Sequence, residues 1–268
     1  MGGLYHEAGA NTSIRILEVE TVERGLAYAE GCFETFRVVR GEVFAWDAHA
    51  ARLCRGLAAW GYDLTPAMLS EVYQRCLARA AAVADDALVR LTVSPGPSPW
   101  GILRRAGNLV ARVQAMSMPA GREPFHLRRA HWPWPPLPRE AKYLADYARL
   151  GMVLHRLGTQ DLVFIHQETV LSAAVANVLI YRDGQWWTPT SGAGVLPGVV
   201  RAHLLTSGVV REAVCPAAWL DDCEGMALAN SGMFVRPVAT LDGRNLPASL
   251  EASAVLRATF PPSIGRLM

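Results

Sequence analysis

Segments with strand-like spacing alternate with segments of helical spacing, and this pattern restricts the fold more than any other feature of the chain. Alternating or β-branched runs predict strands, and apolar residues at helical spacing predict helices between them. In the first half, the predicted strands are Thr12–Val19, Phe33–Phe44, Ala87–Ser94 and Asn108–Ala115, and the predicted helices are Ala48–Tyr62 and Thr65–Val83. Thr65 is a suitable N-cap for the second helix, with Pro66 in its first turn.

A stretch that contains proline and glycine, Met116–Pro124, separates this half from the next and predicts a connection between domains. In the second half we expect strands at Phe125–Ala130, Leu162–His166, Asn177–Arg182 and Trp186–Thr188, helices at Lys142–Leu157 and Val199–Ser207, and a strand pair around Ala227–Leu241. We therefore predict an α+β protein with an N-terminal α/β domain (residues 1–117), a connection (118–124) and a C-terminal domain (125–268).

The composition excludes several classes of protein. The 268 residues are 51% hydrophobic and 19% charged, which is typical of a globular chain. A formal charge of +2 without a basic block argues against nucleic acid as a partner. No apolar run reaches the roughly 20 residues that span a membrane, and the N-terminus lacks a secretory signal pattern. The five cysteines form no CxxC pair, so we expect reduced thiols, no metal site and a cytoplasmic location.

Lys142 is the only lysine in the chain, beside 25 arginines. A preference for arginine explains why lysine is scarce, but it does not explain why one lysine remains. A lysine amine can form a Schiff base, whereas the guanidinium of arginine stays protonated and cannot replace it. Lys142 is therefore a candidate for covalent catalysis, and a chance lysine on a solvated helix face is the alternative.

A set of motifs spread over the chain resembles one enzyme family. The segment Arg24–Leu53 contains a glycine turn, the Phe33–Glu34–Thr35 strand, and a His-x-x-Arg-Leu helix start. Further motifs follow in the family's order: Lys142, Asn177, Thr188–Pro189, Leu196–Arg201, Ala229–Ser231 and Arg236–Val238. Each motif is weak by itself, but their order and spacing together resemble the class IV aminotransferases and aminodeoxychorismate lyases. The resemblance implies the two-domain α+β fold of fold-type IV, like that of D-amino-acid aminotransferase, with pyridoxal 5'-phosphate in the cleft between the domains.

The resemblance also implies a function for individual residues. Lys142 would carry the cofactor and act as general base, and Arg52 would bind the cofactor phosphate. The other residues implied to hold the phosphate are the backbone amides of Gly198, Val199 and Val200 at a helix start, and Ser231 or its neighbour Asn230. Thr35 would assist proton transfer at the reactive face, although a packing function in the strand is equally compatible with threonine.

One position departs from the family pattern. The family has a glutamate five residues before the asparagine that corresponds to Asn177, and this carboxylate keeps the cofactor ring nitrogen protonated. The same position here is Ser172, while the nearest acid, Glu168, fits only after a change of register. A serine can donate a hydrogen bond to the ring nitrogen but cannot keep it protonated at neutral pH. Transamination should suffer most from this change, and elimination least.

The substrate is the least determined feature. After the strand that ends at Ser94, the chain reads SPGPSPWG and lacks the Arg-x-His pair of D-amino-acid aminotransferases. The string GCFETFRV resembles aminodeoxychorismate lyase, which releases p-aminobenzoate and pyruvate in folate biosynthesis. A branched-chain or D-amino-acid aminotransferase and a catalytically silent relative remain as alternatives. Members of the family are usually dimers, so the resemblance implies a homodimer that acts on a small amino substrate.

Overall fold

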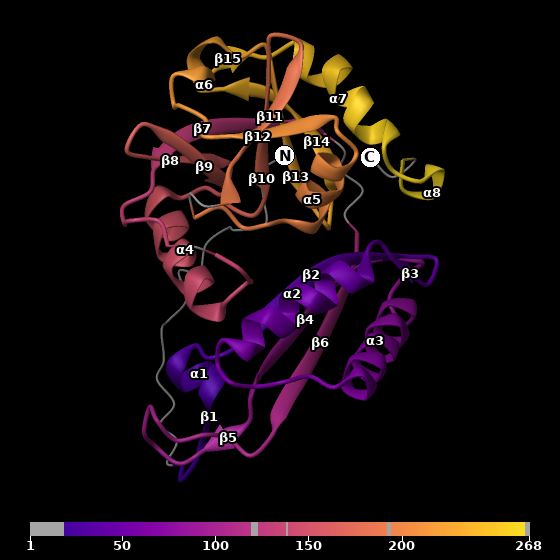
Figure 1. The fold of residues 1–268 in the computed structure, drawn as a ribbon, viewed down its shortest axis with the longest axis vertical. Coiled ribbons are helices and arrows are strands. Elements are labelled where there is room, and N and C mark those ends of the chain that lie inside the picture. The colour runs from indigo at the N-terminus through magenta and orange to yellow at the C-terminus, as the bar shows by residue number, and fades with distance from the viewer. Residues whose placement is uncertain (1–18, 119–122, 138, 192–193, 266–268) are drawn as a thin grey trace, which may run out of the picture.

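The computed structural model describes residues 19–118, 123–137, 139–191 and 194–265, and its strands form three sheets (Figure 1). β1 (Val22–Glu23) pairs with β5 (Pro97–Ser98) in a small two-stranded sheet beside the helix α1 (Arg24–Tyr28). A four-stranded sheet and a larger sheet contain the remaining strands. The strand expected at Thr12–Val19 lies, apart from Val19, outside the described residues.

The four-stranded sheet has the order β3-β2-β4-β6 and is antiparallel throughout. Its strands are β2 (Cys32–Val39), β3 (Glu42–Val43), β4 (Asp86–Pro95) and β6 (Leu109–Ser117), and the helices α2 (Trp46–Ala58) and α3 (Pro66–Ala81) accompany it. Because side chains alternate along a strand, Cys32, Phe36 and Val38 of β2 share one face and pack in a core with both helices. The predicted cap is confirmed: the Thr65 hydroxyl accepts a hydrogen bond from the Met68 N–H at 3.2 Å.

The larger sheet contains the strands from β7 onward and has the order β12-β11-β10-β13-β14-β7-β8-β9, with β15 on β14. Its strands are β7 (Phe125–His131), β8 (Leu162–His166), β9 (Thr169–Ala173), β10 (Asn177–Arg182), β11 (Gln185–Pro189), β12 (Val210–Ala213), β13 (Gly225–Asn230), β14 (Phe234–Leu241) and β15 (Arg244–Asn245). Its helices are α4 (Leu144–Leu157), α5 (Val199–Thr206), α6 (Trp219–Asp222), α7 (Ala248–Ala258) and α8 (Pro262–Gly265). The domain boundary at 118–124 stays a prediction, and residues 119–122 lie outside the described residues.

The helix expected from Lys142 begins two residues later, at Leu144. The preceding backbone pairs with β2 instead: the Phe33 N–H donates to the Lys142 carbonyl at 3.0 Å, and the Leu144 N–H donates to the Gly31 carbonyl at 3.1 Å. These two bonds flank Tyr143, whose backbone is extended and forms a bridge with Cys32, and they fix the backbone at Lys142 against β2.

Strand β9 and helix α7 were not expected from the sequence. β9 follows β8 through a turn at Gln167 and Glu168, which have φ values of 45° and 59°. A turn with left-handed backbone usually contains glycine. This turn contains none, so the sequence did not indicate the hairpin.

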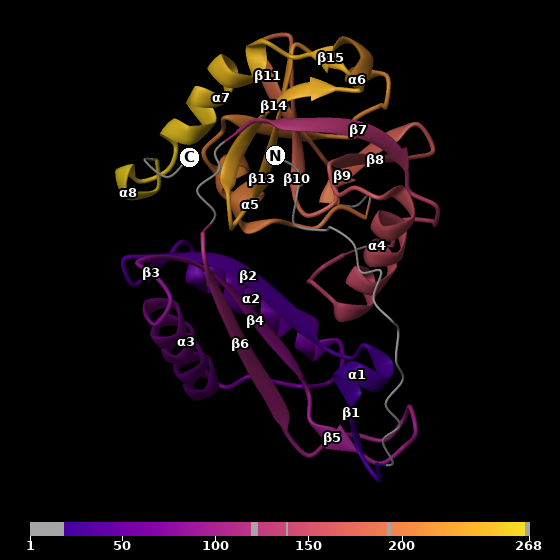
Figure 2. The same ribbon diagram turned by 180° about the vertical axis from the view of Figure 1, so that it is seen from behind.

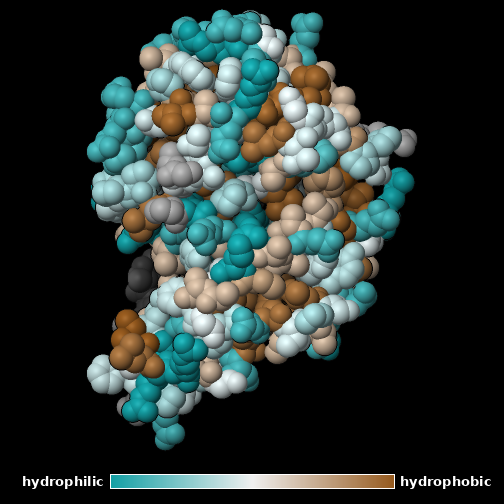
Figure 3. Space-filling view, in the orientation of Figure 1, coloured by the Kyte–Doolittle hydropathy of each residue, from teal (hydrophilic) through white to brown (hydrophobic). Residues whose placement is uncertain are grey.

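Figures 1 and 2 show the elements β1 to β6 on one side of the molecule and the larger sheet on the other. The start of α4 lies beside the N-terminal elements in both views, which agrees with the backbone pairing of Lys142 to β2. On the face in Figure 3, hydrophilic residues surround scattered hydrophobic patches. None of the helices within the described ranges is long and apolar enough to cross a membrane.

Candidate active site

A cavity lies where the two halves of the chain meet, and we call it the central cavity. Its lining comprises Arg52, Arg139, Lys142, Tyr147, residues 172–177, Leu196, Gly198, Val199 and residues 229–231. Seven of the residues proposed from the sequence therefore line one cavity: Arg52, Lys142, Ser172, Gly198, Val199, Asn230 and Ser231. Thr35 and Val200 do not belong to the lining.

Arg52 is held by a buried carboxylate at one end of this cavity. Its Nε donates to Glu34 Oε1 at 2.8 Å and its Nη2 donates to Glu34 Oε2 at 2.6 Å, while Nη1 donates to the Pro197 carbonyl at 2.9 Å. Both charged residues are almost fully buried, with exposures of 1–2%. A guanidinium has five N–H donors, so two remain for a ligand after these contacts with described residues. The bidentate pair therefore fixes the direction in which Arg52 presents its free donors.

His49 completes this buried group from the same helix. Its Nδ1 lies 2.7 Å from Glu34 Oε2, and its Nε2 has no hydrogen-bond partner among the described residues. Burial lowers the pKa of His49 in spite of the contact with Glu34. Burial alone would raise the pKa of Glu34, but the hydrogen bonds from Arg52 and His49 outweigh it and lower that pKa to about 2. At neutral pH Glu34 is thus ionised, and burial favours the neutral form of His49.

Lys142 faces the aromatic ring of Phe33. Its Nζ lies 5.4 Å from the ring centroid, and the guanidinium of Arg90 lies 3.7 Å from the same centroid. Burial lowers the pKa of Lys142 to about 8; Glu34 opposes this, and the positive charges of Arg52 and Arg139 add to it. A lysine with this pKa has a substantial fraction of free amine at neutral pH, as a nucleophile or general base requires.

The start of α5 contributes backbone donors without a side-chain cap. Gly198 is the N-cap residue, and no described side chain accepts a hydrogen bond from the first turn. A Cβ on Gly198 would lie 2.0 Å from the carboxamide oxygen of Asn177, so only glycine permits this approach. The Asn177 amide in turn donates to the Leu196 carbonyl at 2.9 Å. Val199 lines the cavity, whereas the Val200 side chain is fully buried in the core, so Val200 can act only through its backbone.

Ser231 lies in the turn after β13 and lines the cavity. The neighbouring side-chain amide of Asn230 already makes hydrogen bonds within the protein. Asn230 Oδ1 accepts from the N–H groups of Gly232 and Met233 at 2.9 Å, and its Nδ2 donates to the Val175 carbonyl at 3.1 Å. The Ser231 carbonyl accepts from the Arg37 N–H at 3.1 Å. Asn230 therefore shapes the turn, and Ser231 is the better candidate for contact with a ligand.

At the Ser172 end of the cavity, the described lining contains no acid. Ser172 lies in β9 and lines the cavity, whereas Glu168 lies in the turn before this strand and lines a different pocket with Arg129 and Asp221. No carboxylate belongs to the described lining of the central cavity, but three cationic side chains do: Arg52, Arg139 and Lys142. The cavity thus favours an anionic ligand and offers no acid to protonate a ring nitrogen.

Thr35 lies on β2 opposite Arg90 and is partly buried. Side-chain alternation puts it on the same strand face as Phe33, but outside the cavity lining. Its proposed function in proton transfer stays a prediction.

Four residues around the cavity were not singled out from the sequence as site residues: Glu34, His49, Arg139 and Tyr147. Tyr147 packs edge-on against Phe33 with ring centroids 4.5 Å apart. Glu34 could have been found, because an acid between the core residues Cys32 and Phe36 must be paired when it is buried. His49 and Arg52 are three residues apart, a spacing that gives them one helix face toward this acid.

Comparison with known proteins gives a family and a fold. The model of the family "Amino-transferase class IV" matches residues 31–241. A protein named "Putative aminodeoxychorismate lyase" from Schizosaccharomyces pombe is 41% identical over 51 residues; the match spans 19% of this chain and only 22% of that protein's length.

Two solved structures illustrate the shared fold. A structure titled "Putative 4-amino-4-deoxychorismate lyase" from Legionella pneumophila has a TM-score of 0.76 and 19% identity, and the match covers 92% of this chain and 96% of that one. A "hypothetical aminotransferase" from Mycobacterium tuberculosis, solved in its PLP-bound form, has a TM-score of 0.73 and 22% identity, with 95% of both chains covered. The predicted α+β architecture of fold-type IV is confirmed. The family model covers most of the sequence, and the chain therefore belongs to the amino-transferase class IV family of enzymes.

Proposed function

We propose that the protein is a pyridoxal-phosphate-dependent lyase that converts 4-amino-4-deoxychorismate to p-aminobenzoate and pyruvate. The observation that carries the choice of a lyase is the acid-free lining of the central cavity, with Ser172 where the family has a glutamate. The proposal is also supported by the names of the Schizosaccharomyces and Legionella relatives.

The residues present fit the proposed cofactor. A phosphate dianion needs several N–H donors and positive charge. Arg52 keeps two donors after its contacts with described residues, and Gly198 gives the first turn of α5 no side-chain cap. Arg52, Gly198, Val199 and Ser231 would hold the phosphate, and Lys142 would lie at the reactive carbon. These donors come from both halves of the chain, so the bound cofactor would contact both halves.

The mechanism assigns a separate function to each part of the cavity. When bound, pyridoxal phosphate supplies a conjugated system that accepts the electrons left on a substrate carbon after proton removal. Lys142, with a pKa of about 8, accepts that proton as general base. Arg52 is held by Glu34 and keeps the phosphate end fixed. Phe33 and Tyr147 pack beside Lys142 and restrict water around its amine.

Ser172 favours elimination over amino-group transfer. A hydroxyl leaves the ring nitrogen unprotonated at neutral pH, which weakens electron withdrawal. Elimination expels a leaving group and makes less demand on that withdrawal than transamination does. The cleavage of the ether bond to the pyruvyl group is an elimination of this kind.

The first experiment is reaction of the purified protein with pyridoxal phosphate, followed by borohydride reduction and peptide mapping. Because Lys142 is the only lysine, we expect a visible absorption band and one reduced adduct, on the peptide that contains Lys142. The variant Lys142→Ala is the matched control and should form no band. Absence of an adduct on the wild-type protein would support the catalytically silent alternative.

A branched-chain or D-amino-acid aminotransferase is the second candidate, and the similarity to the Mycobacterium "hypothetical aminotransferase" supports an aminotransferase without indicating its amino acid. Two assays on the loaded enzyme separate the candidates. A lyase releases p-aminobenzoate from aminodeoxychorismate, whereas an aminotransferase forms glutamate from 2-oxoglutarate and an amino acid. Glutamate formation without p-aminobenzoate release would replace our proposal by this one.

We also propose a cytoplasmic homodimer, with a small amino substrate as the other partner. The dimer follows from the sequence resemblance. Met116 on the edge strand β6 is 52% exposed, which leaves apolar surface there for a second copy. Light scattering that gives the mass of a monomer would contradict the dimer.

A further inference from the structure

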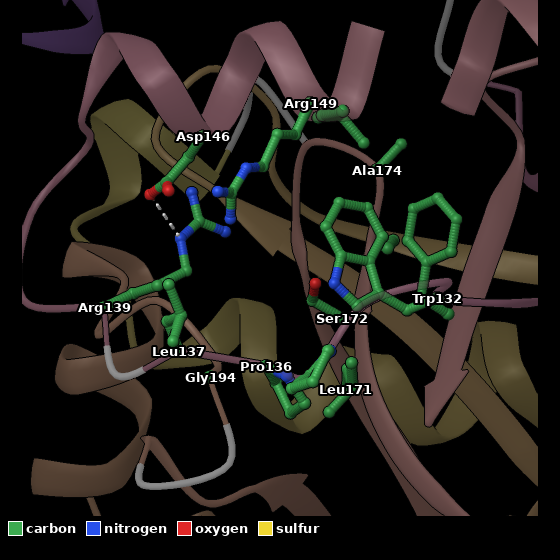
Figure 4. A pocket seen from close by; sticks show the side chains of 14 residues that line it. Trp132, Pro136, Leu137, Arg139, Asp146, Arg149, Leu171, Ser172, Ala174 and Gly194 are labelled. Carbon is green, nitrogen blue, oxygen red and sulfur yellow. Dashed lines mark hydrogen bonds and ion pairs between the residues drawn. The ribbon is translucent and has the colours of Figure 1, made fainter. Parts of the chain in front are cut away.

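A second pocket adjoins the central cavity on the other side of Ser172, and we call it the α4 pocket. Figure 4 shows its lining side chains, which come from α4, β9 and the proline-rich loop before Arg139. Arg139, Ser172, Ala173 and Ala174 line both this pocket and the central cavity. The two spaces are therefore neighbours that share a wall.

The polar side of the α4 pocket has more positive than negative charge. Arg139 and Arg149 line it with a single acid, Asp146. Asp146 is paired with Arg139, whose Nε lies 3.1 Å from its carboxylate, whereas Arg149 makes no ion pair or hydrogen bond with any described residue. Figure 4 shows the guanidinium groups of both arginines directed into the same side of the pocket. One positive charge thus remains without a counter-charge.

The opposite side of the pocket is apolar and aromatic. Trp132 lies there and packs edge-on against Phe164 with ring centroids 5.3 Å apart. Leu171 adds aliphatic surface on this side, whereas Leu137 lies beside Arg139 (Figure 4). The pocket volume of about 70 Å³ corresponds to roughly five water molecules, and their removal would make room for a single ring that carries one acid group.

We propose that the α4 pocket binds a small aromatic carboxylate. Arg149, with Arg139 beside it, would bind the carboxylate, and Trp132 would pack against the ring. An inorganic anion would leave the aromatic wall uncovered, and a neutral ring would leave Arg149 without a partner, so the lining selects a molecule with both features. This inference does not depend on the proposed lyase reaction, because Arg149, Arg139 and Trp132, which carry it, have no function assigned in that reaction.

Isothermal titration calorimetry with benzoate tests the site on the cofactor-loaded protein. We expect saturable 1:1 binding that is weakened at least about tenfold in Arg149→Gln, since a charge-assisted contact is lost. Arg149→Lys should restore part of the affinity. Arg156→Gln is the matched control, because Arg156 is an exposed arginine of the same helix outside the pocket, and its affinity should equal that of the wild type. Arg149 is exposed and pairs with no described residue, so the variant should fold.

Benzamide and inorganic phosphate are the chemical controls, and both should bind at least about tenfold more weakly than benzoate. Equal binding of either one, or unchanged affinity in Arg149→Gln, would overturn the proposal. Release of pyridoxal phosphate by benzoate would also overturn it, because benzoate would then occupy the Arg52 end of the central cavity. Tighter binding of p-aminobenzoate than of benzoate would identify the reaction product as the ligand, and equal binding a general aromatic acid; both results support the site.

Discussion

The two ends of the central cavity are built in opposite ways. At the Arg52 end, Glu34, His49 and Arg52 are 0–2% exposed and hydrogen-bonded to one another. At the Ser172 end, Arg139 of the cavity lining pairs with Asp146 of the adjoining α4 pocket, and the two side chains keep 24% and 27% of their surface exposed. The first end cannot move without leaving a buried charge unpaired, whereas the second can rearrange at little energetic cost.

This difference separates two tasks that a ligand cavity must perform. Because buried charges cost several kcal/mol when unpaired, a group like Glu34 and Arg52 is suited to hold a constant feature such as a phosphate. Surface ion pairs contribute only about 0–1 kcal/mol, so the Arg139 and Asp146 end can vary its partners. We therefore expect specificity to depend on the Ser172 end and cofactor retention on the Arg52 end.

The largest predicted effect is that of Glu34→Gln, which leaves Arg52 buried without its carboxylate. We expect the free energy of unfolding to fall by about 3–5 kcal/mol, and pyridoxal phosphate to dissociate more readily because Arg52 is no longer held. Asp146→Asn is the matched change at the open end and should cost less than about 1 kcal/mol. Urea unfolding and a cofactor titration measure both quantities. Equal losses of unfolding free energy and of cofactor affinity in the two variants would contradict the proposed difference between the two ends.

The sequence predicted more of the fold than of the connections inside the site. Periodicity located β8 and β10 with their observed bounds, because apolar runs between turn residues specify strands locally. It missed β9, whose turn lacks glycine, and it began α4 two residues early, because the pairing of Lys142 with β2 is a long-range contact. Local patterns do not contain such contacts.

The same limit applies to the site residues. The order of the motifs was sufficient to select Arg52, Lys142 and Ser172, which all line the central cavity. The motifs did not indicate that Glu34 holds Arg52 from 18 residues away, or that the amide of Asn230 is used within its own turn. Hydrogen-bond partners depend on how a strand and a helix are placed against each other. The spacing of motifs along the chain does not specify that placement.

The second predicted effect concerns Lys142, which lines the same cavity. Its pKa of about 8, against 10.5 for an ordinary lysine, means that the amine becomes reactive as the pH rises through 8. We expect the initial rate of reductive labelling of Lys142 by pyridoxal phosphate to have its midpoint there. Arg139→Gln removes one of the cations that lower this pKa, so its midpoint should move upward.

The unfolded chain gives a further test of the Lys142 pKa. Between pH 8 and 10.5 the amine of the unfolded chain binds more protons than that of the folded chain, so this group makes folding more favourable as the pH rises across that interval. In Lys142→Met this contribution should disappear. A labelling midpoint near 10.5 in the wild type would contradict the desolvated amine.

The smallest predicted effect on stability, and the most informative about the reaction, is that of Ser172→Glu. Ser172 is only partly buried and lies where the central cavity meets the α4 pocket, so the new carboxylate can reach water or Arg139. The free energy of unfolding should change by less than about 1 kcal/mol. The carboxylate would keep the ring nitrogen protonated, and amino-group transfer to 2-oxoglutarate should therefore rise relative to p-aminobenzoate release. Ser172→Gln, which adds similar volume without charge, is the control and should leave that ratio unchanged. An equal rise in both variants would mean that space at the open end, rather than charge, decides between the two reactions.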